Sequence, residues 1–427
     1  MLKESITPLL AEHYFDLLSS SYRQRNRLFS SYQHGYSELI DWDTYIINYL
    51  QGLLLTADDT NEYIQDRISE SVLSKGDLFA IALYALAFNL DDYLHAVLTL
   101  TQASEEFDEV VRDTLLWAPT HSVLWSILPD YPMYHAYALA VRPDITIAPV
   151  INLRHLSVVR PSVLAVKAFD AIYHQNARDY FALVERLYSQ NDAAKIIATE
   201  SLLNTRAHFS HRLSVEESLY QLTASANHVV ADLAGEIFIL KSGLPVNKYL
   251  EFIRRELKNK RLYIKSLGLY GHIHALPELM AFLDSPELAR LSAASIYMIT
   301  GASPEETGWS GAPMTPQTTP LSDHDGFPEQ DPDSGLTWPD KKAFDAWWTQ
   351  CRGDFTVNQR YLAGKRLSDK KSINALLFKE SLQIACLAAV QLPDVAGLLP
   401  ELLRLPAYAG PHALLLEYRG KENFAWR

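Results

Sequence analysis

Apolar residues recur at intervals of three and four along most of the chain, which is the spacing of an amphipathic helix. Such faces run over 9–18 and over 39–53, and the second of these includes Tyr45. A third helix is expected over 77–88, with Asp77 as its N-cap. No segment alternates apolar and polar residues as a half-buried strand does. The pattern therefore predicts an all-α fold.

The middle of the chain repeats this helical pattern with a period of about 30 residues. Pairs of short helices are expected to end near Arg142, His174, Thr205, Gly243, Gly271 and Gly301. One such pair cannot bury its apolar stripe alone, so stacked neighbours must complete the core, as in an α-solenoid. We expect repeats over 131–301, a divergent N-terminal helical region over 1–130, and a C-terminal helical cap and tail over 341–427.

A long acidic loop is expected over 302–340. From 301 to 340 the chain has seven prolines, five glycines, eight acidic residues and no Lys or Arg. Asp323 and Asp325 lie in it and are candidate partner-binding residues, because negative charge would speed association with a basic partner. The alternative is a solvated acidic loop without a partner. A calcium loop is disfavoured because prolines break the required ligand register.

The composition narrows the class of protein. A hydrophobic fraction of 48% over 427 residues excludes a wholly disordered chain. The net charge of −13 disfavours direct nucleic-acid binding, which needs a basic surface, but allows a basic protein partner. No apolar run approaches the roughly 18 residues of a membrane span, and no signal peptide is visible. Two cysteines, Cys351 and Cys386, argue against a disulfide framework, so we expect a cytoplasmic location.

Two groups of segments resemble known proteins. The segments 264–271, 274–279 and 288–294 resemble HEAT-like repeats of the phycobilisome-lyase type. A further set is similar to a little-characterised bacterial family of HEAT-repeat-like proteins that often accompanies type VI secretion effector genes: 297–301, the acidic gap, 335–340, the Trp pair, 352–355 and 360–364. The resemblance is strongest over 230–365. It implies an α-solenoid of HEAT-like helix pairs and a role near such effectors. His272 departs from the common repeat, which has a small acidic turn residue there.

The densest aromatic cluster lies after the acidic loop. It contains Trp338, Trp347 and Trp348 together with two phenylalanines. Trp and Arg are enriched at the hot spots of protein interfaces, so these residues, with Arg352 and Arg360, are candidates for partner binding. The alternative is that the aromatic side chains cover the open end of the solenoid, since terminal repeats expose an apolar face.

A second candidate surface is basic. Arg254, Arg255 and Lys258 belong to the strongest cluster of cationic residues in the chain. The cluster would suit a docking patch on an otherwise acidic protein. The alternative is a solvated helix face whose cations complement the negative end of the helix dipole.

The sequence contains no recognisable catalytic, cofactor-binding or metal-binding motif. It has no HExxH, CxxC, P-loop, GxGxxG or GxSxG pattern. The closest histidine pairs, His208 with His211 and His272 with His274, have no third ligand nearby in the sequence. HEAT-repeat metal hydroxylases use His-Glu dipeptides, and the chain has none. We therefore expect no catalytic residues and no cofactor.

The function that the sequence favours is a non-enzymatic protein-binding scaffold, because solenoids offer long surfaces for partners. The resemblance implies that its cognate partner is a type VI secretion effector, bound by an immunity protein or by an effector chaperone or adaptor. Net charge suits a basic toxin or effector domain. Two alternatives stay open: a HEAT-repeat enzyme, either lyase-like or metal-dependent, and a chain that is itself a secreted effector.

Overall fold

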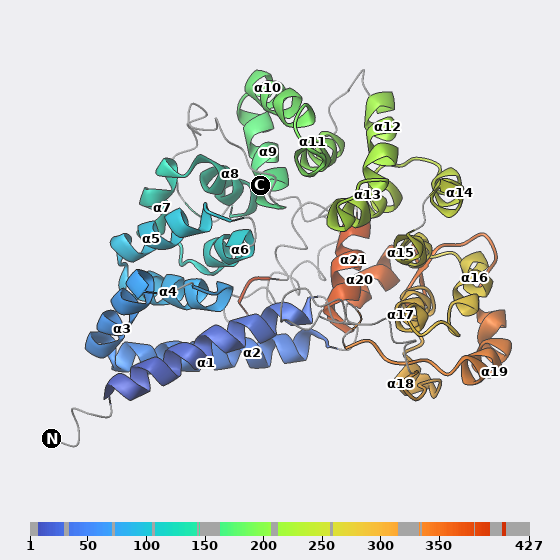
Figure 1. The fold of residues 1–427 in the computed structure, drawn as a ribbon, viewed down its shortest axis with the longest axis horizontal. Helices are drawn as coiled ribbons and strands as arrows, with labels where there is room; N and C mark the ends of the chain where they lie inside the picture. The colour runs from blue at the N-terminus through green and yellow to red at the C-terminus, as the bar shows by residue number, and fades with distance from the viewer. Residues whose placement is uncertain are drawn as a thin grey trace, which may run out of the picture. The chain divides into compact units, whose positions relative to one another are not determined.

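The computed structural model confirms the all-α prediction (Figure 1). It describes residues 7–29, 34–70, 73–104, 107–142, 145, 163–205, 212–256, 259–314, 333, 335–379, 381–392 and 404–406. Over these residues the strands are limited to one hairpin, in which β1 (Tyr361–Leu362) pairs antiparallel with β2 (Lys365–Arg366). The chain forms two compact units. Unit 1 comprises 1–30, 35–210 and 394–427, and unit 2 comprises 31–34 and 211–393.

Unit 1 consists of helices that pack largely on their neighbours in sequence. Its elements are α1 (Thr7–Leu28), α2 (Tyr36–Leu55), α3 (Ala57–Glu70), α4 (Lys75–Phe88), α5 (Asp91–Thr101), α6 (Asp108–Trp117), α7 (Leu124–Ile127), η2 (Leu128–Asp130), α8 (Pro132–Val141), α9 (Val163–Gln175), α10 (Ala177–Tyr188) and α11 (Asp192–Asn204). The boundary expected between 130 and 131 falls inside this unit, because α8 packs on both α6 and α9.

The helix α4 is the centre of unit 1, because it is apolar on every side and buried from Gly76 to Leu86. The prediction that Asp77 is its N-cap was wrong. The N-cap is Ser74, whose Oγ accepts from the Asp77 N–H at 3.2 Å. The Asp77 carboxylate accepts from the Ser74 N–H at 2.9 Å in return. Asp77 is therefore the third helical residue of a capping box, a role that an acidic residue three positions after a serine suits.

A buried ion pair joins α1 to α2. Arg25 is fully buried, and its Nε donates to Asp43 Oδ1 at 2.5 Å. A second nitrogen of Arg25 donates to the carbonyl oxygen of Arg404 at 2.8 Å. The Arg404 guanidinium lies 3.6 Å from the carboxylate of Asp113 on α6 and over the ring of Phe29. The expected C-terminal region 341–427 is therefore divided, since these contacts hold residues near 404 in unit 1.

Unit 2 carries the clearest repeats. Its elements are α12 (Arg212–Thr223), α13 (His228–Leu240), α14 (Val246–Glu256), α15 (Lys260–Tyr270), η4 (Ile273–Ala275), α16 (Leu276–Ala281), α17 (Ala289–Thr300), α18 (Pro304–Thr307), α19 (Lys341–Cys351), η5 (Arg352–Asp354), α20 (Lys370–Lys379) and α21 (Leu382–Gln391), with the β1–β2 hairpin between η5 and α20. In the two units together, the six predicted helix ends fall within three residues of the ends of α8, α9, α11, α13, α15 and α17.

The β1–β2 hairpin closes the C-terminal ends of two neighbouring repeat helices. The Tyr361 N–H donates to the Gly271 carbonyl at the end of α15, at 2.6 Å. The Ala363 N–H donates to the Met298 carbonyl near the end of α17, also at 2.6 Å. Gly301 caps α17 with φ +71, and a Cβ on it would lie 2.5 Å from the Ala363 carbonyl oxygen. Glycine is therefore required there both for its backbone conformation and for the close approach.

Gly301→Ala should destabilise unit 2 by about 2 kcal/mol or more, because it adds left-handed strain to a backbone clash. Gly308→Ala should cost less, since that glycine has φ +77 but open space around its Cβ position. Gly353→Ala, which has neither feature, should be nearly neutral. Urea unfolding of the three variants measures this order. Equal losses in all three would show that the hairpin contact is unimportant.

Asp43→Asn should lower the free energy of unfolding of unit 1 by about 3 kcal/mol or more, because it removes the ion-pair partner of a fully buried Arg25. Asp41→Asn is the matched control, since Asp41 is an exposed acid on the same helix. Chemical denaturation of both variants measures the difference. A loss below about 1 kcal/mol for Asp43→Asn would contradict a structural role for the pair.

Candidate functional site

The flank of α2 carries a partly exposed run of aromatic side chains, which we call the α2 aromatic stripe: Trp42, Tyr45 and Tyr49. Tyr45 is 46% exposed. Its ring centroid lies 5.6 Å from that of Trp42 and 6.4 Å from that of Tyr49. The spacing of three and four residues places the three rings along one side of the helix.

The core side of α2 is distinct from this stripe. Leu39, Asp43, Ile46 and Leu53 are buried, whereas Tyr45 is exposed although its sequence pattern groups it with them. The apolar pattern over 39–53 is thus wider than the buried face needs. An apolar pattern that is too wide for one buried face is the sequence feature that points to this surface.

Negative charge accumulates on α2 and on the helix that follows it, α3. The α2 and α3 segments, 36–55 and 57–70, contain eight acidic residues and one basic residue, Arg67, a net charge of 1 − 8 = −7. Asp41, Asp58, Glu62 and Asp66 are exposed. Among the described residues none of these four carboxylates forms an ion pair. The helix that carries the stripe and the helix that follows it are therefore rich in exposed acids, whereas Asp43 is neutralised in the core by Arg25.

The predicted aromatic cluster forms a ladder of rings in unit 2. Trp309 and Phe344 are fully buried with centroids 5.0 Å apart. The ladder continues from Phe344 to Trp347 at 5.6 Å, to Trp348 at 6.2 Å and on to Phe355 at 5.4 Å. Trp347 and Trp348 are half-buried. The rings therefore pack on a buried anchor, and the half-buried Trp347, Trp348 and Phe355 are the members of the ladder that are partly open to a partner.

Trp338 packs separately from this ladder. Its ring lies beneath the Arg290 guanidinium, 4.6 Å from the ring centroid. Arg290 also donates to the Asp333 carbonyl at 3.0 Å, and Arg261 forms an ion pair with the Asp333 carboxylate. Two arginines of the repeats thus hold the segment that leads into α19.

The two candidate arginines near the ladder have different surroundings. Arg352 is exposed and, within the described residues, has no ion-pair partner. The Nε of Arg360 donates to the Tyr270 carbonyl at 2.7 Å, and its NH2 donates to the Leu269 carbonyl at 3.3 Å. Burial lowers the pKa of Arg360 from its ordinary value. Arg360 therefore caps the end of α15, where a cation also meets the negative end of the helix dipole.

The predicted basic patch is partly occupied. Arg254 is 66% exposed but lies 3.3 Å from the Glu278 carboxylate. Arg255 is exposed. Lys258 lies outside the described residues, as do the acidic-loop candidates Asp323 and Asp325. Partner binding by these residues remains a prediction.

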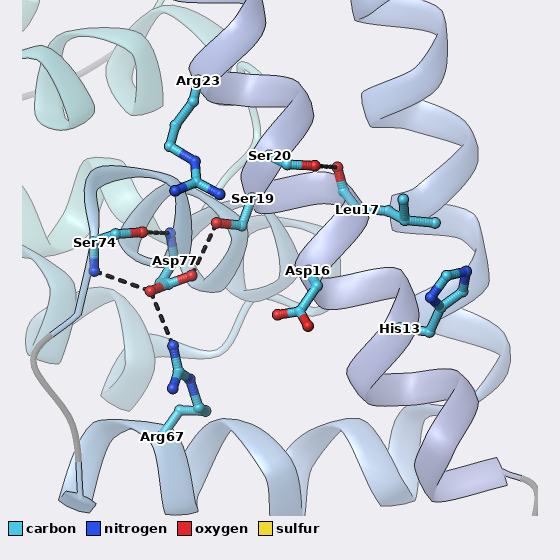
Figure 2. A pocket seen from close by; sticks show the side chains of 9 residues that line it. All are labelled: His13, Asp16, Leu17, Ser19, Ser20, Arg23, Arg67, Ser74 and Asp77. Atoms are coloured by element: carbon cyan, nitrogen blue, oxygen red, sulfur yellow. Dashed lines mark hydrogen bonds and ion pairs between the residues drawn. The ribbon is translucent and has the colours of Figure 1, made fainter.

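A polar depression of about 500 Å³ lies on unit 1 between α1, α3 and the start of α4 (Figure 2). No sequence motif marks it, because its walls come from three helices. The residues that line it are His13, Asp16, Leu17, Ser19, Ser20, Arg23, Arg67, Ser74 and Asp77. Asp77 lies in its floor and accepts hydrogen bonds from the Ser19 hydroxyl at 2.9 Å and from Arg67 at 3.0 Å.

A stack of rings lies where the hairpin meets α15. The His272 ring is 5.5 Å from the Tyr270 ring and 4.7 Å from the His274 ring, centroid to centroid. His272 Nδ1 accepts from the His274 N–H at 3.3 Å, which requires that nitrogen to be unprotonated. The His272 backbone pairs with that of Arg360. Burial, then His274 and Arg360, lower the pKa of His272 below its ordinary value.

Acidification should therefore destabilise unit 2 through His272. The unfolded chain protonates this side chain near its ordinary pKa, about 6.5, whereas the folded chain resists protonation until a lower pH. The stability that this group contributes is fully present above the pKa of the unfolded chain. It is lost as the pH falls from there through the lower pKa of the folded chain. Between pH 7.5 and pH 5, the urea midpoint should fall more for the native chain than for His272→Asn. Equal falls would contradict the assignment.

Within the described part of the chain, no three His, Cys, Asp or Glu side chains lie close enough to hold a metal ion. No described helix combines the length and the apolar character needed to cross a membrane.

A scan of protein-family models, a search of curated proteins and a search of solved structures each found no match to the chain.

Proposed function

We propose that the chain is a non-enzymatic protein-binding scaffold that holds a basic protein partner on the α2 aromatic stripe. The observation that carries the proposal is the exposure of Tyr45 beside Trp42 and Tyr49 on a helix whose other side is fixed in the core. Tyr and Trp dominate the binding energy of protein interfaces, because they bury a large area at a small cost in side-chain entropy.

Charge supports the class of partner. The α2 and α3 segments carry a net charge of −7, more than half of the −13 of the whole chain. Exposed carboxylates on the helix that carries the apolar anchors and on the next helix favour a partner that presents Lys or Arg beside an apolar centre. Such complementarity acts mainly by raising the association rate.

The resemblance stated above supplies the biological setting of the proposal. In that setting the partner is a type VI secretion effector, and the chain is either its immunity protein or its chaperone or adaptor. An immunity protein would abolish the toxic activity of the bound effector, whereas a chaperone or adaptor would leave that activity intact and be needed for export. The activity of the effector in the purified complex separates these two roles.

Tyr45→Ala should weaken partner binding at least tenfold, mainly through faster dissociation, because it removes the central ring of the stripe. The measurement is biolayer interferometry of the full chain against the purified product of each gene that neighbours its own. Phe88→Ala is the matched control, since Phe88 is 43% exposed elsewhere in unit 1, and it should change the affinity less than twofold.

Failure of every neighbouring gene product to bind would overturn the proposed setting. A bound product whose affinity is unchanged by Tyr45→Ala would overturn the assignment of the surface. Reduced binding by Trp347→Ala and Trp348→Ala alone would instead place the contact on the ring ladder of unit 2.

The exposed acidic residues of α2 and α3 should control the association rate. A variant combining Asp41→Asn, Asp58→Asn and Glu62→Gln should slow association several-fold at low salt and flatten its dependence on salt, while dissociation changes little. Asp354→Asn, an exposed acid of unit 2, is the control. An unchanged association rate in the triple variant would contradict electrostatic attraction by this surface.

A further inference from the structure

The floor of the depression on unit 1 is a hydrogen-bonded group around Asp77 whose charges are paired. Asp77 is buried, and its carboxylate accepts from Ser19, from the Ser74 N–H and from Arg67. Gly76 permits this arrangement, because a Cβ at that position would lie 2.3 Å from the Ser19 carbonyl oxygen. The α1 backbone and the start of α4 therefore meet directly beneath the depression.

Two charged groups of opposite sign remain at the rim. Asp16 and Arg23 are exposed side chains of α1 that line the depression, and within the described residues neither has an ion-pair partner. They are seven residues apart, which puts them on one face of the helix and about 10.5 Å apart along its axis. Figure 2 shows the Arg23 guanidinium directed back along α1 toward Ser19, with the Asp16 carboxylate on the same side.

The distribution of charge limits the ligand. A free anion such as phosphate would meet Arg23 but would also face the carboxylates of Asp16 and Asp77. A simple cation would meet Asp16 but would face the guanidinium groups of Arg23 and Arg67. A molecule that carries both charges satisfies both rim groups at once, and the volume lies within the range of small-molecule sites.

We propose that this depression binds a small zwitterion of the amino-acid class. The carboxylate of the ligand lies on the Arg23 guanidinium, its ammonium group lies on the Asp16 carboxylate, and the Asp77 capping box forms the floor beneath it. Guanidinium and carboxylate groups form the stronger, charge-assisted type of hydrogen bond with such ligands. The proposal does not rest on the partner-binding function.

The test is isothermal titration calorimetry of the full chain with each of the twenty L-amino acids. Acetate, methylammonium and inorganic phosphate serve as probes that carry one kind of charge. At least one amino acid should bind at least tenfold more tightly than any of these three. Arg23→Gln and Asp16→Asn should each lower the affinity of the chain for that amino acid at least tenfold. Both variants should melt at the same temperature as the native chain, since both side chains are exposed.

Arg27→Gln and Asp92→Asn are matched controls, because both residues are exposed and lie outside the depression. They should change the affinity less than twofold. Absence of binding by all twenty amino acids would overturn the proposal. Tighter binding of phosphate than of any amino acid, or an affinity that Asp16→Asn does not change, would also overturn it and would identify an anion site on Arg23 alone.

Discussion

The buried pair of Arg25 and Asp43 is the interaction on which the proposed partner surface depends. A helix with apolar residues around more than half of its circumference has no single preferred rotation about its axis. Asp43 removes that freedom, because its carboxylate must face α1 to neutralise a fully buried guanidinium. With Asp43 fixed inward, Ile46 and Leu53 enter the core, and Tyr45 is left on the exposed flank.

The same guanidinium connects distant parts of unit 1. Arg25 donates to the Arg404 carbonyl, and Arg404 in turn lies beside Asp113 and Phe29. Unit 2 is closed by different means, because its hairpin supplies N–H groups to the carbonyl ends of α15 and α17, and Arg360 supplies further donors to α15. Both units thus satisfy buried polar groups with residues far away in the sequence.

The net charge of the chain is unevenly distributed among its helices. Outside the acidic loop the charge nearly balances in the sequence, which suggests an even distribution. The residues of α2 and α3 instead sum to −7, including Asp43, which Arg25 neutralises in the core, whereas the segment 335–379 has nine basic and four acidic residues, 9 − 4 = +5. An average over the chain conceals two regions of opposite sign, and of their aromatic side chains Tyr45 in the acidic region is exposed, whereas Trp347 and Trp348 in the basic region are half-buried.

The sequence predicted those features that depend only on residues close together in the chain, such as helix ends. The ends of α15 and α17 were predictable because Gly271 and Gly301 adopt the left-handed conformation that glycine tolerates. The start of α4 was misplaced by three residues because Ser74 and Asp77 both suit an N-cap, and only the reciprocal bonds identify the cap.

Non-local contacts could not be predicted. The partners of Arg360 lie about 90 residues away, and those of Arg25 include a carbonyl 379 residues away. The exposure of Tyr45 depends on which side of α2 meets the core, which periodicity does not state. Residues from three helices line the depression on unit 1, so no single sequence motif identifies it.

Hydroxyl-radical footprinting of the chain, alone and bound to its partner, reports whether the α2 aromatic stripe is the contact surface. In the free chain Tyr45 should be oxidised much faster than the fully buried Tyr22 and Tyr84. In the complex, protection should be greatest at Trp42, Tyr45 and Tyr49, with Trp347 and Trp348 unchanged. Protection of the tryptophan pair with no change at Tyr45 would contradict the account.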